Sequence, residues 1–262
     1  MDIGTAPALS NLQLLAAGAA YMIGLGTVHA MAHYSVCHSK VPAFQKLSAV
    51  QQRGFSNRIM CSVHCLVSFL GAAYSLSYKY MGGSFLFSIH PAHCSQLETM
   101  LVAFEIAELI YMTAYDLTYD FGILELAHHA FGLVAEGSCL LLREGITHMC
   151  WVHLAQGTQP FLYLSWCLFQ LKLTSNILFT ASSTACLALW FVLRLVSPAL
   201  LLRHLYYTGE VWQQFSVSAH WRTCAWITVV FLGLNLWWFS RLVAKALSLG
   251  KPAKTATAHK KD

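Results

Sequence analysis

The stretch from Leu12 to His33, LQLLAAGAAYMIGLGTVHAMAH, contains no Asp, Glu, Lys or Arg, and it lies within a longer charge-free segment from Ile3 to Ser39. Later charge-free segments cover residues 59–78, 145–171, 173–193 and 223–240. Each supplies most or all of the roughly 20 residues with which an α-helix crosses the hydrocarbon core of a bilayer. The sequence therefore predicts an all-α integral membrane protein.

The composition of the 262-residue chain excludes a soluble globular protein. Hydrophobic residues make up 57% of it and charged residues 10%, whereas roughly 25% of an ordinary soluble domain is charged. The formal net charge of +5 does not indicate nucleic-acid binding, because many of the basic residues lie from Arg241 onward, where they would face anionic lipid of the cytosolic leaflet. The nine cysteines are an odd number and most fall in apolar stretches, so no disulfide framework is expected.

Seven helical spans are predicted, at residues 12–33, 58–80, 98–118, 123–142, 149–171, 175–205 and 221–246. Pro198 predicts a kink near the end of the sixth span. The first is expected to be retained rather than cleaved as a signal peptide, because it has no basic n-region and is too long. The positive-inside rule places the N-terminus on the lumenal or exoplasmic side and the C-terminus in the cytosol, since the first loop and the tail hold most of the Lys and Arg.

Acidic residues on the third predicted helix indicate a polar cavity inside the bundle. Glu105, Glu108, Met112 and Asp116 follow one another at three- or four-residue steps, which places them on one helical face. Asp120 follows at the end of the same helix. Charges within a membrane are costly unless they are paired or hydrated, so these acids are expected to line an interior cavity that binds lipid.

The fourth predicted helix adds a carboxylate and two histidines to this cavity. Glu125 shares a face with both His128 and His129, so its carboxylate is expected to accept an imidazole N–H. Adjacent residues point about 100° apart on a helix, so at most one of the two histidines is expected to contact the centre of a narrow cavity.

Further polar residues on other predicted spans are assigned to the same cavity. These are His64, Glu136, His153, Gln156 and Arg194. Counted along the helices, Arg194 and Glu136 lie at similar depth, which predicts an interaction between them. For His64 the alternative is an ordinary interhelical hydrogen bond that serves packing alone.

Two histidine pairs imitate the histidine boxes of di-iron membrane oxygenases. His29 and His33 form one pair, and His90 and His93 form the other. The predicted topology puts the pairs on opposite sides of roughly 30 Å of hydrocarbon, so no metal and no resident cofactor is expected. A receptor has only the helix count in its favour, which says little about function.

Several short motifs recur in a fixed order along the chain. They are Asn57-Arg58 with His64, Tyr115-Asp116-Leu117, His128-His129, Arg143-Glu144-Gly145, Gln159-Pro160-Phe161 with Trp166, and Phe191 to Arg194. In this order the chain resembles the TLC-domain family, most of all its small members with little beyond the domain. The family includes the translocating-chain-associating membrane protein, the longevity-assurance ceramide synthases and a ceroid-lipofuscinosis membrane protein. The resemblance implies an N-terminal helix and basic loop over 1–54, a six-helix TLC domain over 55–249 and a basic tail over 250–262.

The resemblance to ceramide synthases implies acyl transfer from acyl-CoA, with paired histidines and two later aspartates as the catalytic groups. His128 and His129 match the histidines, but His153 and Gln156 stand roughly where the aspartates are expected. Because Gln cannot exchange a proton at accessible pH, general acid–base chemistry is compromised. The leading hypothesis is therefore a lipid-binding, regulatory protein of lipid homeostasis. The alternative is an acyl-CoA-dependent N- or O-acyltransferase in which His128, His129 and Asp116 are catalytic.

The expected partners are membrane lipids, with anionic cytosolic-leaflet lipid at the basic tail. Acyl-CoA is expected as a co-substrate only under the acyltransferase alternative. The resemblance implies the endoplasmic reticulum as the location, with onward passage to later secretory membranes or the plasma membrane. The sequence specifies no oligomeric state.

Overall fold

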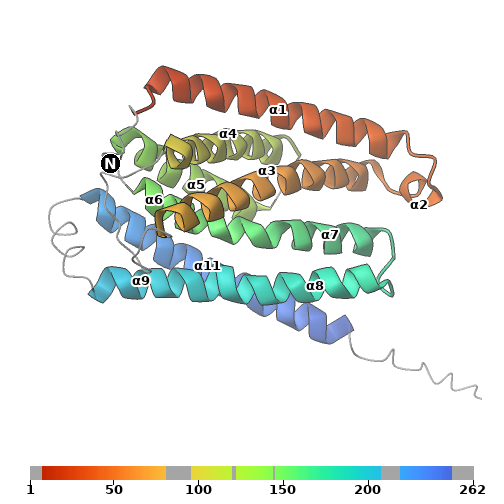
Figure 1. The fold of residues 1–262 in the computed structure, drawn as a ribbon. Coiled ribbons are helices and arrows are strands. Elements are labelled where there is room, and N and C mark those ends of the chain that lie inside the picture. Colours follow the sequence, from red (N-terminus) through yellow and green to blue (C-terminus); the bar gives the residue numbers. More distant parts are fainter. Residues whose placement is uncertain (1–7, 81–95, 120–121, 144, 208–218, 250–262) are drawn as a thin grey trace, which may run out of the picture.

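The chain folds into long helical rods that lie side by side (Figure 1). The computed structural model describes residues 8–80, 96–119, 122–143, 145–207 and 219–249, and no strand occurs within these ranges. The elements are α1 (Asn11–Cys37), α2 (Pro42–Gln45), α3 (Ala49–Tyr80), α4 (Gln96–Tyr119), α5 (Ile123–Leu142), α6 (Ile146–His153), η2 (Leu154–Thr158), α7 (Gln159–Gln170), α8 (Ile177–Leu189), η3 (Trp190–Val196), α9 (Ser197–Tyr207) and α11 (Ala219–Leu249).

Each of the seven predicted segments coincides with a helix or with consecutive helices of one rod. The fifth is α6, η2 and α7, and the sixth is α8, η3 and α9. Among the described residues, four rods are long and apolar enough to cross a membrane: α1, α3, the α8–α9 rod and α11. Of the other three, α4 and α5 carry acidic residues and the α6–α7 rod is interrupted. The described residues thus form the all-helical bundle of an integral membrane protein, while seven crossings and the orientation of the termini stay predictions.

Six of the described rods form a closed ring. In order of contact they are α3, α4, α5, α11, the α8–α9 rod and the α6–α7 rod, which returns to α3. Helix α1 lies outside this ring, against α3 and α4, at the edge of the bundle in Figure 1. The interior of the ring is therefore lined by residues that are far apart in the sequence.

The distribution of polarity is the reverse of that in a soluble protein. Large apolar side chains cover the outside, for example Leu141, which is 83% exposed, and Ile177. Carboxylates and imidazoles lie inside, among them Glu105, Glu136 and His153. An apolar surface around a polar interior suits a bundle that is solvated by lipid tails.

Two of the rods are interrupted where the sequence removes a backbone hydrogen bond. Pro160 follows the 3-10 turn η2. Pro198 follows the π-helical turn η3, in which the N–H of Ser197 donates to Val192, five residues earlier. Because Pro198 has no N–H for the carbonyl of Arg194, the predicted interruption is present, but it takes the form of a π turn that begins before the proline.

Gly157 permits the close packing of η2 on α3. A Cβ atom at this position would lie 2.7 Å from the ring of Phe69, so Gly157→Ala is expected to destabilise the protein by about 1–3 kcal/mol through overpacking. The control is Gly137→Ala, because a Cβ there meets nothing within 4 Å. Thermal unfolding in detergent measures the difference, and equal melting temperatures for the two variants would contradict the packing described.

Candidate functional site

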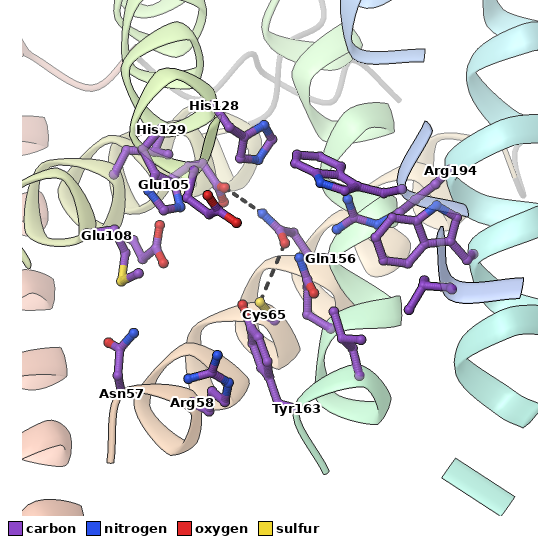
Figure 2. A pocket seen from close by; sticks show the side chains of 18 of the residues that line it. Asn57, Arg58, Cys65, Glu105, Glu108, His128, His129, Gln156, Tyr163 and Arg194 are labelled. Atoms are coloured by element: carbon purple, nitrogen blue, oxygen red, sulfur yellow. Dashed lines mark hydrogen bonds between the residues drawn. The ribbon is translucent and has the colours of Figure 1, made fainter. Parts of the chain in front are cut away.

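A cavity of about 380 Å³ lies inside the ring (Figure 2). All six ring rods contribute to its wall. Its polar lining consists of Asn57, Arg58, Glu105, Glu108, Glu125, His128, His129, Gln156, Gln159 and Arg194, with Arg241. Its apolar and aromatic lining includes Leu109, Met112, Leu162, Tyr163, Trp190, Trp238 and Leu242. The cavity thus combines charges of both signs with an apolar surface.

Most residues assigned to the cavity from sequence lie in its wall or contact a residue that does. Seven line it: Glu105, Glu108, Glu125, His128, His129, Gln156 and Arg194. His64, Asp116 and His153 stand behind the wall and contact Glu105 or His129, while Glu136 contacts His153. Asp120 lies outside the described residues.

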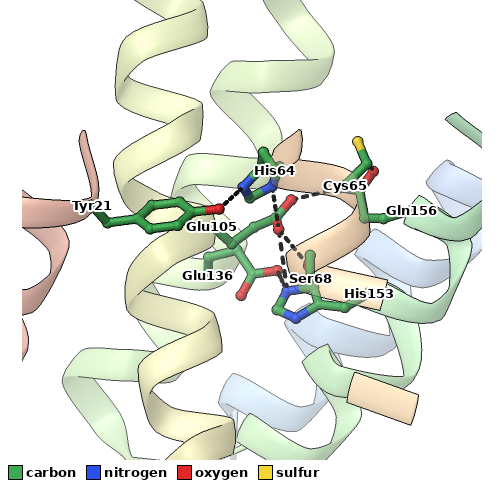
Figure 3. Close-up of polar contacts among 8 residues, drawn as sticks. All are labelled: Tyr21, His64, Cys65, Ser68, Glu105, Glu136, His153 and Gln156. Carbon is green, nitrogen blue, oxygen red and sulfur yellow. Dashed lines mark hydrogen bonds and ion pairs between the residues drawn. The ribbon is translucent and has the colours of Figure 1, made fainter. Parts of the chain in front are cut away.

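Glu105 is the centre of a buried hydrogen-bond network (Figure 3). Its Oε2 accepts from His64 Nε2 and from Ser68 Oγ, each at 3.0 Å, and its Oε1 accepts from Gln156 Nε2 at 2.7 Å. Tyr21 from α1 lies 3.0 Å from the second ring nitrogen of His64. The face predicted from the spacing of the α4 acids is therefore the one that points into the ring.

Glu136 pairs with a histidine rather than with Arg194, so the predicted Arg194–Glu136 interaction is wrong. Its Oε1 lies 3.0 Å from His153 Nε2, and the same nitrogen lies 3.9 Å from Glu105. Counting residues along a helix gives depth but not direction around its axis, and His153 fills the position facing Glu136. The segment without the two aspartates thus packs against carboxylates supplied by α4 and α5.

Arg194 is buried among neutral acceptors. Its Nε donates to Thr158 Oγ1 at 2.7 Å and to the carbonyl of Ala155 at 3.2 Å, while Nη1 donates to Asn235 Oδ1 at 3.2 Å. Its guanidinium carbon lies 4.6 Å from the ring centroid of Trp190. Within the described residues it makes no ion pair, so its positive charge is not cancelled by a bonded carboxylate.

Asp116 and His129 form a close pair at one side of the cavity. Asp116 Oδ2 lies 2.5 Å from His129 Nδ1, so the carboxylate that accepts the imidazole N–H comes from the end of α4 and not, as predicted, from Glu125. The neighbouring His128 also lines the cavity, with its ring centroid 5.6 Å from that of His129. The expectation that at most one of the two would contact the centre assumed a narrow cavity, whereas this space spans all six rods and both histidines line it.

Three cationic or aromatic side chains that were not predicted from the sequence also line the cavity: Arg58, Arg241 and Trp238. Arg241 was expected to face anionic lipid with the basic residues that follow it, yet it lines the cavity, as does Arg58. The ring of Trp238 packs edge to face against His128, with centroids 5.3 Å apart. The sequence feature that could have indicated Arg58 is the Asn57-Arg58 motif, because it lies on the same helix as His64.

The sequence that forms the six-rod ring matches a known protein-family model. The model described as the TLC domain matches residues 54–244, most of the chain. The chain belongs to the TLC-domain family. The match covers nearly all of the six-rod ring of this TLC-domain protein and leaves out α1, the helix that packs outside the ring. A search of curated proteins found no significant match.

The contacts of Arg194 can be tested by double-mutant cycles in the TLC-domain protein. Arg194→Met combined with Thr158→Val is expected to be non-additive by about 0.5–3 kcal/mol, because the two side chains share a hydrogen bond. Arg194→Met combined with Glu136→Gln is expected to be additive to within about 0.5 kcal/mol. Unfolding by sodium dodecyl sulfate in mixed micelles measures both cycles, and stronger coupling to Glu136 than to Thr158 would refute the contacts described.

Proposed function

We propose that this TLC-domain protein binds a membrane lipid in the ring cavity and acts in lipid homeostasis by binding rather than by catalysis. The observation that carries the proposal is a cavity with charged and apolar linings inside an apolar-surfaced bundle. Its volume of about 380 Å³ is at the lower end of the roughly 300–1,000 Å³ typical of small-molecule pockets. It suits a head group and the first carbons of a lipid whose chains extend into the bilayer.

The charges of the cavity wall favour a polar head group over a bare hydrocarbon chain. Arg194 keeps its positive charge without a bonded carboxylate, and Glu108 and Glu125 line the same space. Ionisable groups at membrane depth are costly, so they mark functional sites more often than packing sites. A head group with both hydrogen-bond donors and acceptors would bond to the carboxylates and to the guanidinium of the cavity wall.

Filling the cavity should remove the bound lipid. Leu162 lines it, whereas Leu164 on the same helix is exposed at the outer surface. Leu162→Trp is expected to lower the amount of co-purified lipid several-fold, because an indole occupies the head-group space. Leu164→Trp is the matched control and is expected to retain lipid. Mass spectrometry of the purified variants gives the readout, and equal lipid content in the two would oppose the proposal.

A second candidate function is acyl-CoA-dependent acyl transfer, which the Asp116–His129 pair favours. A carboxylate on Nδ1 fixes the imidazole tautomer and leaves Nε2 free to accept a proton from an amine or hydroxyl acceptor. His128 supports this candidate, because its buried Nδ1 has no hydrogen-bond partner among the described residues. Gln156 need not transfer a proton in this scheme, since Asp116 and His129 supply the pair.

The acyltransferase candidate predicts labelled product from protein in nanodiscs supplied with labelled acyl-CoA and sphingoid or lysophospholipid acceptors. His129→Ala is expected to abolish product, and Asp116→Asn to lower its rate at least tenfold. His29→Ala is the control, because His29 bonds Tyr111 and lies outside the cavity. Wild-type protein that forms no product would favour lipid binding alone, and product that survives loss of His129 would reject the assigned roles.

We further propose the endoplasmic reticulum as the site of action, with passage to later secretory membranes or the plasma membrane. The family relationship supports this location. A cytosolic C-terminus would bring the basic tail, residues 250–262, to anionic lipid of the cytosolic leaflet.

A further inference from the structure

Three buried side chains, two in the wall of the cavity and one directly behind it, have the composition and spacing of metal ligands. His64 from α3 and Glu105 and Glu108 from α4 each offer one ligand atom, and these atoms all lie within 4.8 Å of one another. All three side chains are buried. The cluster combines a nitrogen donor and two carboxylates from two packed helices.

Glu108 is the member of the cluster that the fold leaves without a partner. It is 7% exposed and lines the cavity, yet its carboxylate makes no hydrogen bond or ion pair among the described residues. Figure 2 shows its side chain directed into the cavity. A buried and unpaired carboxylate is costly, so its presence points to a cationic ligand.

The other two members are held in place by surrounding hydrogen bonds. The Nδ1 of His64 contacts the hydroxyl of Tyr21 at 3.0 Å, which leaves Nε2 directed at the cluster. Ser68 and Gln156 donate to the carboxylate of Glu105. Protein metal ligands are commonly oriented by such outer hydrogen bonds, to the second nitrogen of a histidine and to the ligating carboxylates.

We propose that His64, Glu105 and Glu108 bind a divalent transition-metal ion in the cavity wall. Imidazole together with carboxylate suits zinc, iron or manganese, whereas calcium and magnesium prefer oxygen ligands alone. The charges of two carboxylates and a dipositive ion sum to zero, so the ion would offset the free-energy cost of burying the Glu108 carboxylate.

The geometry needs only a small adjustment. Ligand atoms about 2.1 Å from a tetrahedral ion lie about 3.4 Å apart, and the unanchored Glu108 can swing inward to reach this spacing. In the bound form the single proton of the neutral His64 imidazole lies on Nδ1, where it is donated to the Tyr21 hydroxyl, and the lone pair of Nε2 coordinates the ion in place of its hydrogen bond to Glu105. Because Glu105 and Glu108 line the cavity, a further coordination position would be open to a ligand from it.

The direct test is metal analysis of the full chain, purified with a tag that contains no histidine. Inductively coupled plasma mass spectrometry of wild type, loaded with zinc and then desalted, is expected to give about one ion per chain. Glu108→Gln is expected to bind zinc at least tenfold more weakly. This variant should fold, because Glu108 has no hydrogen bond to lose. Glu125→Gln, which removes a carboxylate from the same cavity outside the cluster, is the matched control and should retain the ion.

Two further readouts separate this site from adventitious binding. Cobalt substitution is expected to give a visible d–d spectrum in wild type and Glu125→Gln, and none in Glu108→Gln. Tyr21→Phe is expected to weaken zinc affinity by about 10- to 100-fold through the loss of the outer hydrogen bond. Wild type that retains no zinc, or Glu108→Gln that retains as much as wild type, overturns the proposal. These measurements do not depend on the lipid or on any activity.

Discussion

Burying a carboxylate inside a helical bundle is costly unless donors surround it, and the donors around Glu105 connect three elements of the ring. Its partners come from α3, through His64 and Ser68, and from η2, through Gln156. In a membrane, apolar contacts do not favour a neighbouring helix over a lipid tail, so packing and interhelical hydrogen bonds set the register of the bundle. The depth and rotation of α3, α4 and η2 are therefore tied to a single side chain.

The polar interior contains two groups of residues with different consequences. Glu105, His153 and Arg194 bond to protein partners and join the rods. Glu108 and the Nδ1 atom of His128 lack such partners, and both residues line the cavity. Bonds within the first group account for the closure of the ring, whereas the second group has no role in closure. The lipid and metal-ion ligands proposed above would provide partners for this second group.

Much of the architecture follows from the sequence, because hydrophobic length and helical period are local properties. The helical segments and the inward face of Glu105 and Glu108 were predicted from spacing alone. The partner of Arg194 was not, because a π turn and the rotation of the α6–α7 rod decide which acceptors it meets. The pairing of Asp116 with His129, and the approach of His64 to Glu108, likewise depend on how separate helices pack, which no local pattern encodes.

The position of α1 outside the ring has a consequence for biosynthesis. This helix is synthesised before its partners α3 and α4, so as a membrane span it must reside in the bilayer before Tyr21 can meet His64. A charged side chain on α1 would have no partner in the bilayer until α3 and α4 were made. The order of synthesis therefore accounts for the absence of Asp, Glu, Lys and Arg from Ile3 to Ser39. Neutral Tyr and His side chains are tolerated in the bilayer before their partners are made. The carboxylates of the network enter only with α4, after His64 has been made.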